Sequence, residues 1–299
     1  MPNDREGRPL ALLTVHAHPD DESSKGAGSV ALYAAEGVHT VLVCCTGGEQ
    51  GDILNPAMET PEIRADLPAV RRRELEAATR IIGYDEVVLL GYRDSGMPDT
   101  EANRDPRSFA QADPKEAVGR LVAVIRRVRP QVVVTYPEDQ QGYPHPDHIR
   151  VHEITMPAVD AAADPDAYPE AGDAWTVDKV YYSAWSRTRI VAMHEKFIEL
   201  GLESPFDDHW FDRPSQDELI TTQVDVSRFA DVRRRALIAH ATQVDPTSKF
   251  WFGLPPEVGD QVYPVDDYML ARSAVSTSIP EDDLFAGVRA GNPNELADP

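Results

Sequence analysis

The sequence has little cysteine, little positive charge and no long hydrophobic run. Of its 299 residues only 2 are cysteine, and 29 Lys+Arg stand against 51 Asp+Glu, which gives a formal net charge of −22. Such an acidic chain repels phosphate backbones and anionic lipid headgroups, which argues against nucleic-acid and membrane partners. No apolar run approaches the roughly 20 residues of a membrane span, and the first residues lack the apolar stretch of a secretory signal. We therefore expect a cytoplasmic protein.

The two cysteines, Cys44 and Cys45, are neighbours within one apolar run. A strand would point adjacent side chains to opposite faces, and a disulfide between adjacent residues is geometrically disfavoured. We therefore expect two buried thiols, which suits a reducing compartment. The composition, with 41% hydrophobic and 27% charged residues, is that of a folded globular protein.

Short apolar runs alternate with longer segments of helical composition. Strands are predicted at 10–16, 40–44, 86–90, 131–135 and 179–183, and helices at about 26–36, 67–82, 114–128 and 228–241. Continuous apolar strands are usually buried on both faces, and strands that alternate with helices form βαβ units. The sequence therefore predicts an α/β fold with a Rossmann-like, mainly parallel sheet flanked by helices.

Beyond about residue 185 the alternation weakens, which indicates a smaller mixed C-terminal portion. We expect a catalytic domain at 8–185 and a C-terminal α/β portion at 186–299 that completes the substrate pocket. The small, acidic segment 160–173 is predicted to be an exposed loop.

Histidines and aspartates gather in two loops that follow predicted strands. Residues 16–22 and 142–148 hold four of the nine histidines, mixed with aspartates and prolines. In an open parallel sheet the ligand site lies beyond the carboxyl ends of the strands, and proline stiffens a loop that must hold ligands. His18, Asp21 and His148 could together supply two imidazoles and one carboxylate. Three protein ligands leave a position open for water, as in a catalytic zinc site.

Further titratable groups in these loops suggest catalytic roles. Asp20 is next to a candidate ligand but points away from it, which suits a general base. His145 is expected to act as a general acid or as a cationic stabiliser of an oxyanion, with Asp147 orienting its imidazole. Tyr143 is a neutral donor candidate for the same oxyanion.

At these residues the chain resembles the LmbE-like, or PIG-L, family of zinc deacetylases. The family's His-Pro-Asp-Asp-Glu motif and its downstream His-Pro-Asp-His motif match residues 18–22 and 145–148. The resemblance implies a Rossmann-like fold and zinc-dependent hydrolysis of an N-acyl bond on a glucosamine unit. It also implies the metal ligands and the base, which would be His18, Asp21, His148 and Asp20.

Within this family the chain is most similar to the enzymes that act on mycothiol S-conjugates. The similarity is carried by residues 23–26, 47–51, 53–58 and 240–243, and it becomes patchy beyond about Tyr182. It implies cleavage of the amide between an S-conjugated N-acetylcysteine and glucosaminyl-inositol, which releases a mercapturic acid. Substrate contacts are then expected at Arg71, Asp94, Glu49 and His240. Lys25 is expected to meet the acyl portion of the substrate, because related deacetylases lack a lysine there.

Several alternatives stay open at the level of the sequence. The first is deacetylation of N-acetylglucosaminyl-inositol or a related N-acetylglucosamine. Two histidines and a carboxylate also form the facial triad of Fe(II) oxygenases, and Fe²⁺ could replace Zn²⁺ in the hydrolase. A non-catalytic sugar-binding module would be favoured if His152, one helical turn beyond His148, closed the site as a fourth ligand. The expected partner is a small thiol–sugar conjugate, and the oligomeric state is open, a homo-oligomer included.

Overall fold

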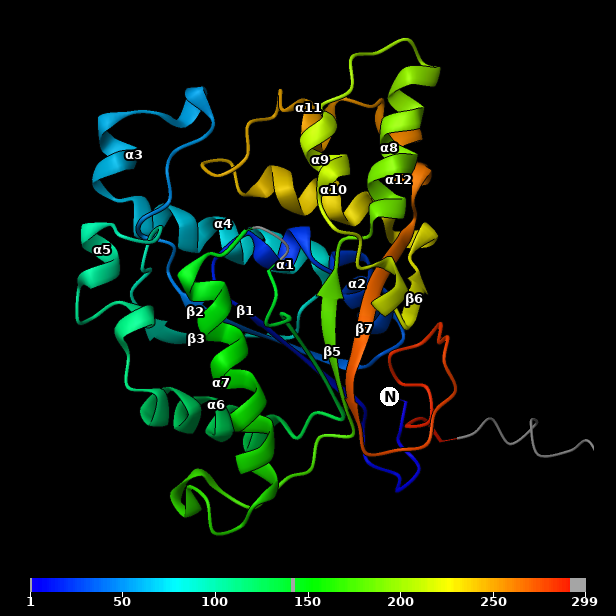
Figure 1. The fold of residues 1–299 in the computed structure, drawn as a ribbon. Helices are drawn as coiled ribbons and strands as arrows, with labels where there is room; N and C mark the ends of the chain where they lie inside the picture. The colour runs from blue at the N-terminus through cyan, green and yellow to red at the C-terminus, as the bar shows by residue number, and fades with distance from the viewer. Residues whose placement is uncertain (1, 141–142, 291–299) are drawn as a thin grey trace, which may run out of the picture.

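Seven strands form one sheet in the computed structural model, which describes residues 2–140 and 143–290. The strands are β1 (Ala11–His16), β2 (His39–Thr46), β3 (Glu86–Tyr92), β4 (Val132–Thr135), β5 (Lys179–Ala184), β6 (Thr222–Asp225) and β7 (Val265–Ser273). Their order across the sheet is β3-β2-β1-β4-β5-β7-β6 (Figure 1). Strands β1 to β5 run parallel, and β7 is antiparallel to both β5 and β6. The predicted α/β class with a mainly parallel sheet is thus confirmed.

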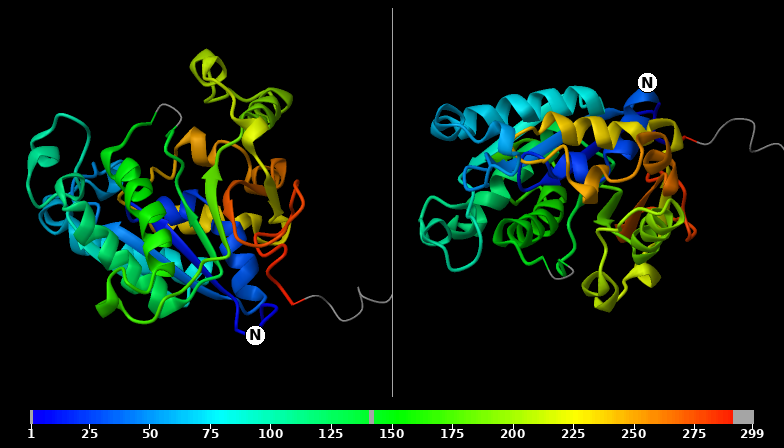
Figure 2. Two further views of the ribbon diagram at one scale, coloured as in Figure 1. Left: turned by 60° about the horizontal axis from the view of Figure 1, so that its bottom comes forward. Right: turned by 90° about the horizontal axis from the view of Figure 1, so that it is seen from above.

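Helices cover both faces of this sheet. They are α1 (Asp21–Ser24), α2 (Ala27–Ala35), α3 (Pro61–Ala65), α4 (Leu67–Ile82), α5 (Glu101–Arg104), α6 (Pro114–Val128), α7 (Pro146–Ala163), α8 (Arg187–Glu199), α9 (Asp208–Asp212), α10 (Ala230–Ala239), α11 (Lys249–Phe252) and α12 (Pro256–Val262). Short 3₁₀ turns lie at Pro56–Met58, Phe109–Gln111, Pro169–Ala171, Asp217–Leu219 and Ser227–Phe229. Helices α2, α4 and α10 pack on one face, and α6 and α7 pack on the other (Figure 2).

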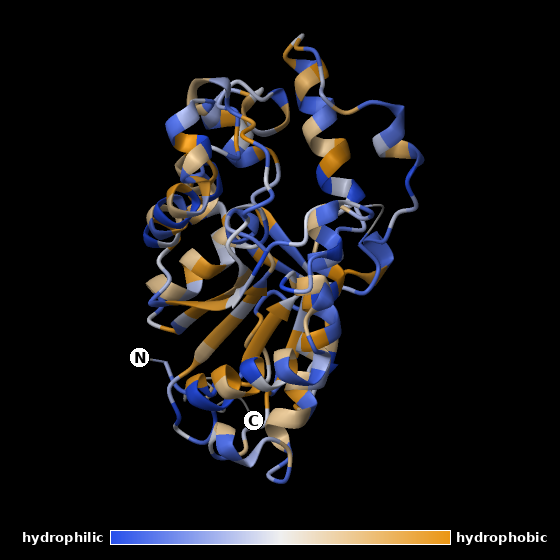
Figure 3. Cartoon of the chain, turned by 90° about the vertical axis from the view of Figure 1, so that its left-hand side faces the viewer, coloured by the Kyte–Doolittle hydropathy of each residue, from blue (hydrophilic) through white to orange (hydrophobic). Residues whose placement is uncertain are grey.

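The central strands are buried on both faces, as their apolar sequences predict. In β1, Leu13 and Val15 enter the core under α6 and α7, whereas Leu12 enters the core under α2 and α10. Figure 3 shows these strands as the most hydrophobic part of the molecule. Each fully buried side chain of this kind contributes about 1.5–3 kcal/mol to folding. Cys44 and Cys45 are free, fully buried thiols that belong to different core clusters, so the prediction for the cysteines is confirmed.

Helix α6 begins where the sequence predicts. The side chain of Asp113 accepts hydrogen bonds from the first-turn backbone N–H groups, and Pro114 occupies the first helical position. Both features are stabilising at a helix N-terminus, because they satisfy or remove backbone donors that have no partner within the helix.

The predicted loop at 160–173 is wrong over its first four residues, which belong to α7. Alanine favours helix, and Ala162 is fully buried. The guanidinium of Arg126 donates to the carbonyl oxygens of Ala161, Ala162 and Asp164 at 2.9, 3.2 and 2.6 Å. These bonds satisfy carbonyl groups at the end of α7 that lack partners within the helix.

Strands β6 and β7 extend the sheet beyond β5 and were not predicted. At the start of β5 a buried ion pair joins Lys179 to Glu281, and both side chains are fully buried. Glu281 also accepts hydrogen bonds from the hydroxyls of Tyr181 at 2.6 Å and Thr222 at 3.0 Å. In the described part of the chain, none of the helices is long and apolar enough to cross a bilayer.

Candidate active site

The two histidine-containing loops meet where the strand order reverses. Strands β1 and β4 are neighbours, but the chain leaves β1 for α2 on one face and leaves β4 for α7 on the other. In open α/β sheets the crevice at such a point is where ligands bind. His18, Asp20 and Asp21 follow β1, whereas His145 and His148 follow β4.

Two imidazoles and a carboxylate converge in this crevice. Nδ1 of His18 and Nε2 of His148 each lie 3.4 Å from Oδ2 of Asp21, and all three side chains are buried. The three ligand atoms lie within 4.8 Å of one another. This donor set fits Zn²⁺ at a catalytic site, and the same donors also accept Fe²⁺. The structure thus brings together the three residues predicted as metal ligands.

The other oxygen of Asp21 faces a cation. Nζ of Lys25 lies 2.6 Å from Oδ1 of Asp21, and it also lies 5.5 Å from the centre of the Tyr136 ring. Burial alone would raise the pKa of the Asp21 carboxyl, but Lys25 and His148 hold this pKa well below its usual range. Asp21 is therefore ionised at neutral pH, as a metal ligand must be.

The second nitrogen of His18 pairs with Asp147. Nε2 of His18 lies 3.1 Å from Oδ2 of Asp147, and that carboxylate accepts hydrogen bonds from the backbone N–H and the hydroxyl of Ser95. A carboxylate behind a ligating histidine fixes the tautomer and the orientation of the ring. The prediction that the carboxylate of Asp147 orients His145 is therefore wrong, because its oxygens face His18 and Ser95.

His145 caps α7 and is uncharged at neutral pH. Its Nδ1 accepts a hydrogen bond from the backbone N–H of Asp147 at 3.2 Å, so the neutral ring carries its proton on Nε2. Burial and the neighbouring His18 and His148 lower the pKa of His145 to about 4. This lowered pKa disfavours the cationic form of His145, and its catalytic role stays a prediction.

Tyr143 stands at the mouth of the site. Its side chain is exposed, and its ring centre lies 5.6 Å from that of His148 and 6.1 Å from that of His145. Partial burial raises the pKa of the Tyr143 hydroxyl, so this group keeps its proton at neutral pH. Tyr143 therefore has both the position and the protonation state of a donor.

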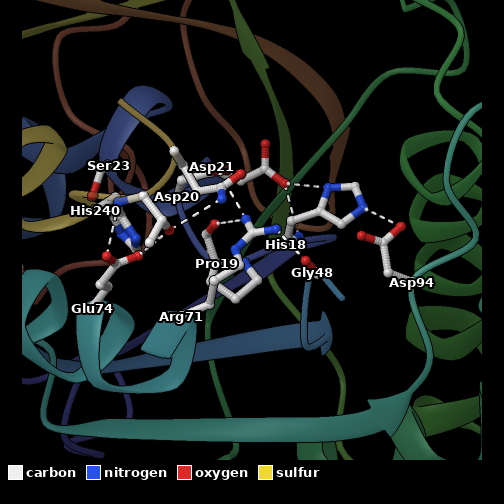
Figure 4. A network of polar contacts seen from close by, with 12 residues as sticks. His18, Pro19, Asp20, Asp21, Ser23, Gly48, Arg71, Glu74, Asp94 and His240 are labelled. Atoms are coloured by element: carbon white, nitrogen blue, oxygen red, sulfur yellow. Dashed lines mark hydrogen bonds and ion pairs between the residues drawn. The ribbon is translucent and has the colours of Figure 1, made fainter. Parts of the chain in front are cut away.

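Asp20 is held by Arg71 beneath the loop (Figure 4). Nη2 of Arg71 donates to Oδ2 of Asp20 at 3.1 Å and to the carbonyl oxygen of Pro19 at 2.6 Å, and Nη1 donates to the carbonyl oxygen of Gly48. A Cβ at position 48 would overlap the guanidinium, which explains the glycine there. Since Arg71 is only 2% exposed, it positions the loop, and direct contact with a sugar stays a prediction.

The backbone and the protonation of Asp20 are both unusual. Asp20 has a φ of 118°, a conformation that non-glycine residues adopt rarely and mainly at functional sites. Burial raises the pKa of its carboxyl, although the charge of Arg71 opposes this effect. The side chain is still 30% exposed, so water can reach it. A carboxylate with a raised pKa beside water is suited to general-base catalysis.

Glu22 and His240 form a fully buried pair that the sequence analysis missed. Nε2 of His240 lies 2.7 Å from Oε1 of Glu22, and Glu22 also accepts from the backbone N–H of Asp20 at 2.9 Å. The prediction that His240 lines the substrate pocket is wrong for this structure, because its side chain has no exposed surface. The sequence did contain one signal for this pair. Glu22 ends the His-Pro-Asp-Asp-Glu motif, and no catalytic role was assigned to it.

Asp94 and Glu49 link the loops that follow β2 and β3. Oδ1 of Asp94 lies 3.7 Å from Nε2 of His18, and its carboxylate accepts backbone hydrogen bonds from Gln50 and Gly96. Glu49 accepts a hydrogen bond from the backbone N–H of Asp94 at 2.9 Å. Both residues border the crevice, and their contact with substrate stays a prediction.

His152 lies apart from the candidate metal ligands. Its Nδ1 is 3.0 Å from the carbonyl oxygen of Tyr136, and its ring packs near Tyr182. Within residues 2–140 and 143–290, the groups that could hold a metal do not include His152. A site closed by His152 as a fourth ligand therefore finds no support.

The chain is a hydrolase of amide bonds, as its family match and its similar relatives show. Residues 13–159 match the family model for GlcNAc-PI de-N-acetylase, PIG-L. A mycothiol S-conjugate amidase of Streptomyces coelicolor is 46% identical over 289 residues, which cover 94% of this chain and 98% of the relative. The chain therefore belongs to the PIG-L family, and the resemblance stated from the sequence is confirmed.

A second relative and two solved structures complete the comparison. A 1D-myo-inositol 2-acetamido-2-deoxy-alpha-D-glucopyranoside deacetylase of Geodermatophilus obscurus is 45% identical and covers 93% of this chain and 97% of the relative. The diacetylchitobiose deacetylase of Pyrococcus horikoshii matches with a TM-score of 0.58 at 17% identity, covering 87% of this chain and 83% of that one. The hydratase GalB of Pseudomonas putida has the same TM-score at 20% identity, covering 90% and 99%. Likeness at this level of identity extends to the fold alone.

Proposed function

We propose that the protein is a zinc amidohydrolase that cleaves mycothiol S-conjugates into a mercapturic acid and glucosaminyl-inositol. The observation that carries this proposal is Lys25, whose ammonium lies beside the candidate metal ligand Asp21 and is partly exposed. A cation there can bind an oxygen of the cysteinyl portion, which a simple acetyl group does not have. The amidase and deacetylase relatives, at 46% and 45% identity, are too similar for identity to choose between them.

His18, Asp21 and His148 would hold the metal through Nδ1, Oδ2 and Nε2. Zinc bound by such ligands lowers the pKa of a bound water to about 7 and polarises a carbonyl oxygen. Asp147, behind His18, would keep that imidazole in the tautomer with a free Nδ1. Lys25 would hold the Asp21 carboxylate by its other oxygen.

The remaining loop residues provide the acid–base chemistry. Asp20 accepts the proton of the attacking water, and the hydrogen bond from Arg71 fixes the direction of its carboxylate. That proton then passes to the nitrogen as the amide bond breaks, and the second proton of the water, released by the new carboxylic acid, completes the ammonium, so that water and amide become carboxylate and ammonium. Nε2–H of His145 and the hydroxyl of Tyr143 are the donors for the oxyanion that forms at the amide carbonyl.

Product analysis tests this proposal directly. The zinc-loaded protein is mixed with a mycothiol S-conjugate and, separately, with N-acetylglucosaminyl-inositol, and the products are identified by mass spectrometry. We expect a mercapturic acid and glucosaminyl-inositol from the conjugate, with the higher kcat/KM. Faster release of acetate from the second compound would identify a deacetylase instead. Removal of metal with a chelator should abolish both reactions, and zinc should restore them.

A further inference from the structure

A cavity of about 120 Å³ lies at the same edge of the sheet as the candidate metal centre but over β5, β7 and β6. Its walls come from α2, α8, α10, α11 and α12, which gather beyond the carboxyl end of β5 in Figure 1. Aromatic side chains form much of its lining, with Trp185 stacked on Phe250 at 5.8 Å and Trp251 edge-on to Phe250 at 4.7 Å. Cavities of about 150 Å³ bind benzene, so the space suits one aromatic ring.

Two arginines in this wall share a single carboxylate. Nη2 of Arg189 and Nη2 of Arg233 both pair with Oδ1 of Asp266. In the described part of the chain, the buried Nε of either arginine has no hydrogen-bond partner, and the side chain of Arg189 is only 6% exposed. Burial and the charge of Arg233 lower the pKa of Arg189 to about 10. The charges of the two arginines face two buried carboxylates, Asp266 and Asp267, so what remains unsatisfied here is the pair of Nε–H donors.

The other charged pair of the wall is balanced. Arg234 and Asp260 also line the cavity and pair with each other at 2.8 Å. Asp267 is buried nearby and accepts hydrogen bonds from Ser186 and Tyr263. The donors without a partner therefore belong to Arg189 and Arg233, and they suit an acceptor oxygen, most strongly that of an anion.

The cavity lies across the sheet from the metal centre, over strands next to β4. Neighbouring strands are about 4.8 Å apart, so β7 lies roughly 10 Å from β4, which the crevice borders. Gly28 in the wall follows Lys25 by three residues, and Leu237 in the wall precedes His240 by three residues. Lys25 and His240 both belong to the network around the catalytic loop. The sulfur of a conjugate is three bonds from the amide carbon, so its substituent extends over a similar distance.

We infer that this cavity binds the S-substituent of the conjugate and favours an aromatic ring that carries an acidic group. The ring packs on Trp185, Phe250 and Trp251, and the acid is bound by the guanidinium groups of Arg233 and Arg189. This inference rests on the proposed function, because it assigns a place to one part of the proposed substrate.

The test compares three conjugates of mycothiol, with methyl, benzyl and 4-carboxybenzyl substituents. For the wild-type zinc enzyme we expect kcat/KM to rise in this order, mainly through KM. Arg233→Gln should lower the ratio of 4-carboxybenzyl to benzyl kcat/KM about tenfold, the effect of losing one charge-assisted hydrogen bond. The matched control is Arg235→Gln, on the same helix, whose arginine is exposed and pairs with Asp231 at 3.0 Å. That control should leave the ratio unchanged.

A wild-type ratio at or below one, or an unchanged ratio in Arg233→Gln, would overturn the inference. Trp251→Ala is a second variant, and it should reduce the preference for benzyl over methyl. Binding of S-(4-carboxybenzyl)-N-acetylcysteine, followed by tryptophan fluorescence of the zinc enzyme, needs no turnover. If no conjugate is hydrolysed but this ligand binds and Arg233→Gln weakens it, the proposed function fails and the cavity assignment survives. If it does not bind, the assignment is rejected.

Discussion

The ammonium of Lys25 lies 2.6 Å from Oδ1 of Asp21, while Oδ2 of the same carboxylate lies 3.4 Å from both candidate metal-binding nitrogens of His18 and His148. One carboxylate thus connects a cation to the predicted metal centre. Because the side chain of Lys25 is 23% exposed, its ammonium can also meet a ligand in the crevice. Lys25 is therefore placed to influence the metal centre and the substrate together.

Replacing Lys25 by alanine should reduce amidase activity more than deacetylase activity. We expect kcat/KM on a mycothiol S-conjugate to fall about 10- to 150-fold, through loss of a charge-assisted hydrogen bond, with a smaller loss on N-acetylglucosaminyl-inositol. Bound metal, measured in the same samples, controls for an effect through Asp21. Lys25→Arg keeps the charge and should keep the metal. Equal losses on both substrates would remove Lys25 from specificity.

Replacing Asp20 should separate metal binding from turnover. Asp20→Asn is expected to keep full metal occupancy and lose about 10²–10⁴-fold in kcat, because the amide cannot accept the proton of water. His18→Ala, Asp21→Ala and His148→Ala should each lose most of the bound metal. Elemental analysis beside kinetics measures both quantities. Near-normal turnover by fully loaded Asp20→Asn would show that another group is the base.

His145 should affect the rate without causing the fall in rate at high pH, which is the basic limb of the pH–rate profile. Its pKa is lowered from 6.5 to about 4, so the ring is already neutral above about pH 4 and does not titrate near neutral pH. A bound cation would lower this pKa further. We expect His145→Ala to reduce kcat about 10²–10³-fold, the effect of losing one oxyanion donor, at every pH between 6 and 9. A pH–rate profile whose basic limb disappears in the variant would restore the protonated role that the sequence suggested.

Glu281 should contribute much of the stability of the region where β5, β7 and β6 extend the sheet. Breaking a buried ion pair costs about 3–5 kcal/mol, so Glu281→Gln should lower the free energy of unfolding by that order. Asp160→Asn, which breaks the exposed pair with Arg272, should cost about 0–1 kcal/mol. Burial alone would raise the pKa of Glu281, but the hydrogen bond from Lys179 lowers it below 4.5. Its contribution is therefore complete above pH 4.5 and is lost as the pH falls through the lowered value. Urea denaturation at pH 7 and pH 4 measures both effects.

The sequence was sufficient to predict the five parallel strands of the sheet and the loops that hold the candidate metal ligands. Apolar runs such as 131–135 are short enough for strands and too uniformly apolar for exposed segments, so their burial followed from composition. His18, Asp21 and His148 lie in proline-stiffened loops at adjacent strand ends, so local sequence and topology together placed them in one crevice.

Contacts between distant segments could not be predicted in the same way. The carboxylate of Asp147 turns toward Ser95, a residue from the loop after β3, and no local pattern reveals that partner. Strand β7 contains Asp266 and Asp267, which are typical of an exposed segment, yet both are buried. Asp266 pairs with arginines from α8 and α10 and with Ser29 from α2, whereas Asp267 accepts hydrogen bonds from the hydroxyls of Ser186 and Tyr263. Such pairs become visible only when the segments are placed in space.

The Glu22–His240 hydrogen bond limits how the chain can be recombined with its relatives. All three candidate metal ligands precede residue 186, yet the loop that carries two of them ends at a buried carboxylate whose imidazole partner comes from the last third. A chimera that exchanges this last third would transfer the loop's anchor along with Arg233, Phe250 and Trp251 of the aromatic cavity. If the incoming segment lacked the histidine, Glu22 would keep a buried charge without its partner, which costs several kcal/mol. New substrate preferences would therefore be introduced more safely by changing side chains of the cavity than by exchanging the segment as a block.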